Sequence, residues 1–259
     1  MVRRHIHPAQ PDHVHHSAIE FMVTEVQTGA SGVSLPVRRR ATVISVYMDN
    51  VDPKVVRYQA YMVDRMMPSG WKFDQYLFRP KSDDWAPHAF ALSQRVEASE
   101  RDIVIILDID CVPLTPQALI YLYDGAAAGE LIGCIQRANH LSNGAHLYVG
   151  PFCMAFDRRV YYGLGSPTFV HSQRGDTGEE LTYHWEAGGR RVRFIWPSHC
   201  EQPMWELDGS TRFGLGTTYA GLFYHTFNIR DGITRQMFID KCLSILQTKS
   251  EPKGRKVTT

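Results

Sequence analysis

Residues 102–110 read DIVIILDID, and this stretch says more about the fold than any other part of the chain. Its five consecutive apolar residues, 103–107, are typical of a strand buried on both faces of a sheet. ATVISVYM at 41–48 is also apolar and β-branched, and it predicts a second buried strand. Strands of this kind occur mainly in parallel sheets covered by helices, so the fold class is α/β.

Helical patterns alternate with the strand patterns in the first half of the chain. Residues 49–67 have Pro53 near their start and carry Val55, Tyr58, Met62 and Met66 at helical spacing. Further helices are expected at 87–99 and 116–125, and further strands at 71–78 and 131–135. This order predicts right-handed crossovers and a mainly parallel central sheet flanked by helices. Ligands bind such sheets beyond the carboxyl ends of the strands, here just after residues 48 and 107.

The second half is less regular. Strands are expected at 146–157, 191–196 and 220–226, helices at 176–189 and 233–246, and a glycine-rich loop at 213–221. These elements form one domain over 41–248. Residues 1–40, which include the histidine-rich stretch HVHH, are expected to be a poorly ordered lead-in, and 249–259 a polar tail.

Composition excludes several classes of protein. Lys and Arg total 28 against 27 Asp and Glu, so the net charge of +1 offers no global attraction to nucleic acid. No apolar stretch is long enough to cross a bilayer, and no signal peptide is recognisable at the N-terminus. The five widely spaced cysteines form no zinc motif and are expected to be reduced. The sequence therefore predicts a cytoplasmic protein.

Asp108 and Asp110 follow the central strand directly. Alternate side chains of a strand share a face, so the two carboxylates point the same way and repel each other unless a cation lies near them. Mg²⁺ or Mn²⁺ is the natural cation, and its remaining coordination positions suit the oxygens of a diphosphate. The alternative is a pair of aspartates in a solvated turn.

The ordered set of motifs resembles the nucleotide-sugar glycosyltransferases of the GT-A fold over about residues 41–246. The matching stretches are VISVYMDN (43–50), LDID (107–110), GPFCMAFDRRVYYGLG (150–165), GDTGEEL (175–181) and LFYHTFNIRDG (222–232). The resemblance implies transfer of a sugar from a nucleotide-diphosphate sugar to a saccharide or other hydroxyl acceptor, with Mn²⁺ or Mg²⁺ as cofactor. No nucleic acid and no membrane span are implied.

The resemblance also assigns roles to individual residues. It implies that Asp108, Asp110 and His225 hold the metal, although a lone histidine in an apolar strand is also a common core residue. The nucleoside is expected along the strand end at 43–50. The residues expected to contact the donor are Val46, Tyr47, Asp49, Asp74, Ile109 and Arg174.

Asp176 stands where these families place an acidic residue before a late helix. The resemblance implies that it is the general base of an inverting transfer, with Glu179 or Glu180 as alternatives. A structural explanation is also available, because Asp176 and Glu179 have the spacing of a helix capping box. If Asp176 has only this structural role, the transfer is expected to be retaining.

Two other functions compete. DIDCV also matches the Asp-x-Asp pattern of haloacid dehalogenase-like phosphatases, but the lysine that these enzymes usually need is missing, because no Lys occurs between 82 and 240. A sugar-nucleotide-binding protein of the same fold without activity is the second alternative. Sugar-nucleotide pyrophosphorylases are excluded, because VYMDNVDPK lacks the glycine-rich loop that they require.

Overall fold

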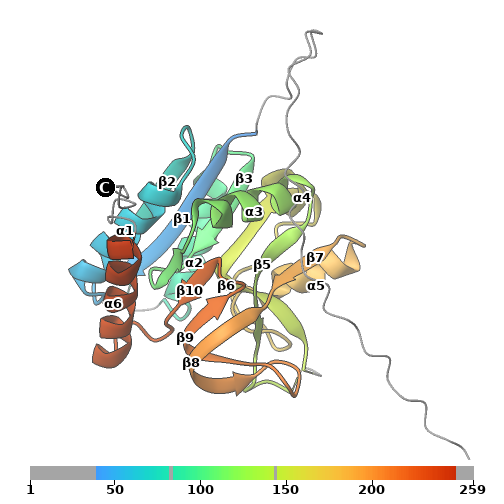
Figure 1. Cartoon of the computed structure of the whole chain (residues 1–259). Coiled ribbons are helices and arrows are strands. Elements are labelled where there is room, and N and C mark those ends of the chain that lie inside the picture. Colours follow the sequence, from blue (N-terminus) through green and yellow to red (C-terminus); the bar gives the residue numbers. More distant parts are fainter. Residues whose placement is uncertain (1–38, 82–83, 143–144, 249–259) are drawn as a thin grey trace, which may run out of the picture. The chain divides into compact units, whose positions relative to one another are not determined.

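The computed structural model describes residues 39–81, 84–142 and 145–248 (Figure 1). Its main sheet has six strands in the order β2-β1-β3-β6-β5-β7. Their bounds are Ala41–Met48 (β1), Lys72–Phe78 (β2), Ile103–Leu107 (β3), Leu131–Arg137 (β5), Leu147–Asp157 (β6) and Val192–Ile195 (β7). The pairings β1–β2, β1–β3 and β5–β7 are parallel, whereas β6 is antiparallel to both of its neighbours. The expected α/β class with a mainly parallel sheet is confirmed.

Helices cover both faces of this sheet. Their bounds are Pro53–Met66 (α1), Pro87–Ala98 (α2), Pro116–Ala127 (α3), Arg158–Gly163 (α4), Glu179–Ala187 (α5) and Gly232–Thr248 (α6). The period of two in β3 divides its apolar side chains between two cores. Ile103, Ile105 and Leu107 pack with residues of α1 and α3, whereas Val104 and Ile106 pack with residues of α2 and α5.

A second, antiparallel sheet follows the aspartates of DIDCV. Its order is β4-β10-β9-β8, with bounds Cys111–Pro113 (β4), Pro197–Glu206 (β8), Arg212–Tyr219 (β9) and Phe223–His225 (β10). The chain therefore leaves the main sheet at the end of β3 and enters the second sheet at β4. Asp108 and Asp110 lie in the turn between the two sheets, where Cys111 N donates to Asp108 O at 2.9 Å.

The prediction of a glycine-rich loop at 213–221 is wrong, because most of this stretch is strand β9. It pairs with β8 on one edge and β10 on the other, so its backbone groups are satisfied by tertiary partners. Glycine is needed at Gly214, where a Cβ atom would lie 2.2 Å from the carbonyl oxygen of Gln202. Glycine often indicates a loop, but at Gly214 it allows the backbone of β8 to approach β9 closely.

The late helix expected at 176–189 begins later, at Glu179. Gly178, its N-cap, has a left-handed backbone with φ of 77°. This turn keeps Asp176 and Thr177 outside the helix, on a loop. Helices α3 and α4 have Thr115 and Asp157 as their N-caps, and Asp157 accepts a hydrogen bond from Arg159 N at 2.8 Å.

The expected lead-in and tail lie outside the described residues, apart from Arg39 and Arg40. These two arginines already contact the domain, since Arg39 pairs with Asp157 and Arg40 O accepts from Asp102 N. All five cysteines are free thiols, as expected. Among the helices of the described ranges, none has the length and apolar character to cross a bilayer.

Gly133→Ala should destabilise the protein strongly. A Cβ atom at this position in β5 would lie 2.1 Å from the carbonyl oxygen of Cys153 and 2.7 Å from Met154 Cα, and backbone atoms cannot move aside easily. We expect the free energy of unfolding in urea to fall by about 1–3 kcal/mol or more.

Gly163→Ala is the matched control, because a Cβ atom there meets nothing within 4 Å. It should be neutral or stabilising by about 0.4–1 kcal/mol. Equal losses in both variants would contradict this packing analysis.

Candidate functional site

The two aspartates are held by backbone hydrogen bonds at the carboxyl end of β3. Asp108 N donates to Phe152 O of β6 at 2.9 Å, and Gln59 Nε2 of α1 donates to Asp108 O at 2.9 Å. Thr226 N donates to Asp110 O at 3.2 Å. Asp110 is buried, whereas the side chain of Asp108 is 23% exposed. Asp108 is therefore the more accessible of the two residues, and its Oδ1 atom is nevertheless buried.

His225 lies beside Asp110 because β10 pairs with β4. The antiparallel register sets His225 opposite Cys111, the residue after Asp110. His225 Nε2 lies 3.1 Å from Asp110 Oδ1. The imidazole ring stacks on Phe152, with ring centroids 4.1 Å apart. It also contacts the ring of Phe227, just after the end of β10, with centroids 3.8 Å apart. The neighbouring rings leave His225 only 3% exposed.

These three residues form a donor set that suits a divalent cation. Asp108, Asp110 and His225 each offer one ligand atom, and these atoms lie within 4.8 Å of one another. The 3.1 Å between Asp110 Oδ1 and His225 Nε2 matches the separation of about 3.0 Å between neighbouring ligands on an octahedral ion with bonds of about 2.1 Å. The other ring nitrogen, His225 Nδ1, is buried and has no hydrogen-bond partner among the described residues.

His88 completes this group, and our sequence reasoning missed it. Its Nε2 lies 3.2 Å from Asp108 Oδ1. Burial by itself raises the pKa of Asp108, but the charge and hydrogen bond of His88 outweigh burial and leave this pKa below its ordinary value. Burial likewise lowers the pKa of His88, and the neighbouring aspartates outweigh it and raise the pKa. The available signal was Pro87, which starts helix α2 in the crossover between β2 and β3, at the edge of the sheet where ligands bind.

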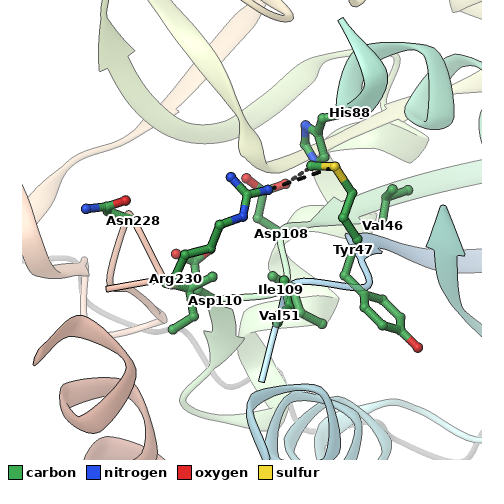
Figure 2. Close-up of a pocket in the computed structure, with 11 residues that line it drawn as sticks. Val46, Tyr47, Val51, His88, Asp108, Ile109, Asp110, Asn228 and Arg230 are labelled. Carbon is green, nitrogen blue, oxygen red and sulfur yellow. Dashed lines mark hydrogen bonds and ion pairs between the residues drawn. The ribbon is translucent and has the colours of Figure 1, made fainter. Parts of the chain in front are cut away.

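A cavity of about 280 Å³ opens beside the aspartates, and Figure 2 shows it. We call it the donor-side cavity, because residues expected to contact the donor line it. Three of the expected donor contacts, Val46, Tyr47 and Ile109, line it. Met48, Val51, His88, Asn228, Ile229 and Arg230 also line it. Arg230 Nε donates to Asn50 Oδ1 at 3.1 Å, which holds the guanidinium at the cavity mouth. In Figure 2 the side chains of His88, Asp108 and Arg230 gather on one side of the cavity.

Three other expected donor contacts lie elsewhere. Asp49 is exposed in the turn after β1 and does not line the cavity. Asp74 pairs with Arg95 and lines a different cavity with Thr42 and Lys72, at the amino ends of β1 and β2. Asp74 is near the start of its strand, and parallel strands put their starts at the edge opposite the site.

Arg174 likewise does not line the donor-side cavity. Its guanidinium pairs with Glu180 and lies 4.3 Å from the centre of the Tyr183 ring. Hydrogen bonds from Arg174, and also from Ser172, lower the pKa of Glu180 to about 2. Arg174 therefore ties the loop before α5 to that helix, which is a structural role that its position in the sequence does not reveal.

Asp176 lines another cavity, of about 390 Å³, on the opposite side of the metal-ligand group. Its carboxylate accepts hydrogen bonds from Tyr148 Oη at 3.3 Å and from Thr177 N at 2.7 Å. Half of the expected capping box forms, because Asp176 N donates to Glu179 Oε2 at 2.8 Å. Glu179 itself is fully buried and faces His146, so it does not line this cavity.

The cavities join into one cleft through the metal-ligand group. A middle cavity of about 250 Å³ is lined by Asp108, Asp110 and His225. It shares Asp108, Asp110, His88 and Asn228 with the donor-side cavity. It shares Gln136 and Phe227 with the Asp176 cavity. The expected metal ligands therefore lie between the two cavities.

No protein-family model matches the sequence, and no curated protein matches it. Among solved structures, the chain is similar to a variant of Drosophila β-1,4-galactosyltransferase 7 in complex with manganese, UDP-Gal and xylobiose. The identity is 15%, the match covers 84% of this chain and 82% of that chain, and the TM-score is 0.46.

Two further similar structures are a mannosyltransferase and a nucleotide-dependent synthase. The mannosyltransferase, from Pyrobaculum calidifontis in complex with GDP-Man and Mn²⁺, has 14% identity over 61% of this chain and 55% of that chain, with a TM-score of 0.42. The second is 4-diphosphocytidyl-2C-methyl-D-erythritol synthase of Anaerococcus prevotii, with 10% identity over 82% and 100% of the two chains and a TM-score of 0.44. Similarity of this degree assigns no function, which must come from the geometry of the site.

Asp110→Asn should weaken binding of Mn²⁺, because it removes a charged ligand and keeps the shape of the side chain. We expect a loss larger than the 10–100-fold that removal of an outer-shell partner typically costs. Free Mn²⁺ measured by electron paramagnetic resonance in a titration gives the affinity. Asp102→Asn is the control, because Asp102 lies before the opposite end of the same strand, where it accepts from Arg40 N at 3.0 Å. Unchanged affinity in Asp110→Asn would exclude this site.

Glu180→Gln should lower the melting temperature at neutral pH. The folded protein holds the pKa of Glu180 at about 2, below its ordinary value of 4.5. A depressed pKa contributes stability above the unfolded pKa, and this contribution is lost as the pH falls toward 2. The difference in melting temperature between wild type and variant should therefore shrink below about pH 4.5. Glu206→Gln is the control, since the exposed Glu206–Arg137 pair contributes little. A difference that is constant with pH would contradict the assignment.

Proposed function

We propose that the protein is a metal-dependent glycosyltransferase of the GT-A type, which moves a sugar from a nucleotide-diphosphate sugar to an acceptor hydroxyl. The observation that carries this proposal is the position of Asp108, Asp110 and His225. They lie within 4.8 Å of one another at the junction of the donor-side cavity and the Asp176 cavity. A diphosphate leaving group, a metal and a proton acceptor are needed side by side, and this junction supplies a place for each.

The donor-side cavity suits a nucleoside with its diphosphate toward the aspartates. Val46, Val51 and Ile229 give it an apolar wall that suits a base. Arg230 and His88 bring cationic groups to the side where the diphosphate would lie. Asp108, Asp110 and His225 would hold Mn²⁺ or Mg²⁺, which when bound neutralises the charge that develops on the departing diphosphate.

Asp176 is proposed as the general base. Its carboxylate accepts from Tyr148 Oη and Thr177 N, so its orientation is set before substrate binds. In the proposed step the acceptor hydroxyl gives its proton to Asp176, and its oxygen forms a bond to the anomeric carbon. The bond between that carbon and the diphosphate oxygen breaks, and its electron pair leaves with the diphosphate. This is an inverting transfer.

The Asp176 cavity suits a saccharide acceptor. Three aromatic rings, those of Trp205, Phe213 and Phe227, pack on one another with centroids 5.2–5.7 Å apart and line the cavity. Such rings complement the apolar face of a sugar, while Asp176 and Gln136 offer partners to its hydroxyl groups. An aromatic wall with polar groups around it favours a saccharide over other hydroxyl acceptors.

A thermal-shift screen tests the donor half of this proposal. UDP, GDP, CDP and ADP are each added with and without Mn²⁺, and the nucleotide that binds should raise the melting temperature only with the metal. Metal-dependent hydrolysis of the matching nucleotide sugar then separates an active transferase from an inactive binding protein. Steady phosphate release from simple phosphomonoesters, abolished by Asp108→Asn, would instead favour the phosphatase alternative.

Asp176→Asn should slow transfer without weakening donor binding. The oxygen of asparagine can still accept from Thr177 N, and its NH₂ group can donate to Tyr148 Oη, which then accepts instead of donating, so the loop should keep its shape. The proton acceptor is lost, and turnover should fall by about 10²–10⁴-fold. Turnover is measured under saturating donor and acceptor, and donor affinity by calorimetry. Asp208→Asn serves as the control, because Asp208 holds the exposed turn between β8 and β9. Normal turnover in Asp176→Asn would favour a retaining mechanism.

A further inference from the structure

His146 lies between two carboxylates of helix α5. It stands immediately before β6, outside the group of residues that line the cleft. Its Nδ1 lies 2.7 Å from Glu179 Oε1, and its Nε2 lies 3.2 Å from Glu186 Oε2. The imidazole also stacks on Tyr183, with centroids 3.9 Å apart and an angle of 10° between the rings. Three side chains of one helix therefore hold this single ring.

Between two ionised carboxylates, this arrangement requires the charged form of the ring. A neutral imidazole has one N–H donor and one acceptor nitrogen, whereas an imidazolium has two donors. Glu179 and Glu186 face different nitrogens, and an ionised carboxylate only accepts hydrogen bonds. In the neutral ring one nitrogen lone pair would face a carboxylate oxygen and the contact would be repulsive. Only the imidazolium satisfies both contacts.

Glu179 connects this ring to Asp176. Its side chain is fully buried, and its Oε2 accepts from Asp176 N at 2.8 Å while Oε1 faces His146. The loop before α5 is packed against the same side chain, because a Cβ atom on Gly175 would lie 3.2 Å from Glu179 Cβ. A change at His146 is therefore transmitted to the backbone of Asp176 through one buried carboxylate.

We propose that His146 is a pH-sensitive positioning residue, whose imidazolium holds Glu179 and thereby fixes the loop that carries Asp176. The role of Asp176 as a base rests on the proposed function, whereas the link from His146 to the Asp176 backbone does not. The clamp, defined as His146, Glu179 and Glu186, also fastens the start of β6 to α5. No residue of the clamp lines the cavity that contains Asp176.

The direction of the pH effect follows from the groups that face the ring. Burial lowers the pKa of His146, but the hydrogen bonds and charges of Glu179 and Glu186 outweigh burial and raise the pKa above its ordinary value. Tyr183 faces the ring as well, and Arg174 contacts the same tyrosine. A raised pKa means that the clamp is complete at low pH and is lost as the pH rises through this pKa. The Asp176 loop should loosen on the alkaline side.

Hydrogen exchange of the Asp176 amide measures the clamp without any substrate. This amide donates to Glu179, so its protection factor, after correction for the intrinsic rate, reports whether Glu179 is held. In the wild type the protection should fall as the pH rises through the titration of His146, followed by its ring resonances. His146→Gln should remove this pH-dependent step and lower protection at pH 6 by about tenfold, the effect expected for loss of a charge-assisted hydrogen bond.

Two further variants make the test independent of any general loss of stability. Glu186→Gln removes one of the two carboxylates at a half-exposed position, and it should lower the pKa of His146 and move the step to lower pH. His184→Gln is the matched control, because His184 lies on the same helix and contacts Leu164 O and, at 3.9 Å, Glu180, but no residue of the clamp. Protection of Asp176 N–H that is unchanged in His146→Gln and Glu186→Gln would overturn the proposal. So would an equal loss in His184→Gln.

Turnover provides the second measurement, and it separates this proposal from the proposed function. If Asp176 is the base, wild-type turnover should have an alkaline limb that moves to lower pH in Glu186→Gln and stays in place in His184→Gln. A clamp seen by exchange in a protein without transferase activity would refute the proposed function alone. An active transferase in which the exchange protection of the Asp176 amide is the same with and without His146 would refute the clamp alone.

Discussion

The contact between His225 and Asp110 joins strand β10 to the turn between the two sheets, across 115 positions of the sequence. A buried carboxylate beside a second carboxylate is costly unless positive charge or strong hydrogen bonds lie near it. His225 supplies one such partner from the interior, and His88 supplies another to Asp108 from helix α2. His225 reaches Asp110 because β10 pairs with β4, whereas His88 reaches Asp108 from the start of α2. The site is therefore part of what fastens the two sheets together.

The segment after β10 forms one wall of the whole cleft. Phe227 lines the Asp176 cavity and the middle cavity, Asn228 lines the middle and donor-side cavities, and Arg230 lines the donor-side cavity. Phe227 and Asn228 both have left-handed backbone conformations, with φ of 57° and 50°. Such conformations are costly for residues other than glycine and occur where the surrounding structure enforces them. Here the stacking of Phe227 against His225 and Trp205 supplies that enforcement.

The residues that the sequence analysis expected to contact the donor fall into two groups, those that line the cavity beside the aspartates and those that lie away from it. Val46, Tyr47 and Ile109 line the cavity beside the aspartates, because a residue at the carboxyl end of a parallel strand lies at the ligand edge wherever the strand sits in the sheet. Asp74 and Arg174 lie away from this cavity. Asp74 is near the opposite end of its strand and pairs with Arg95. Arg174 pairs with Glu180 of α5, a contact that the sequence pattern does not reveal.

Local physical chemistry alone determined the α/β class, the buried strand of DIVIILDID and the two carboxylates at its end. Apolar periodicity and the alternation of side chains along a strand are properties of consecutive residues. Only the tertiary structure decided that His225 meets Asp110 across 115 positions, that His88 faces Asp108, and that Glu179 is buried against His146. These contacts depend on the register of strands that are distant in the chain. Register is set by the packing of whole elements, which no short stretch of sequence contains.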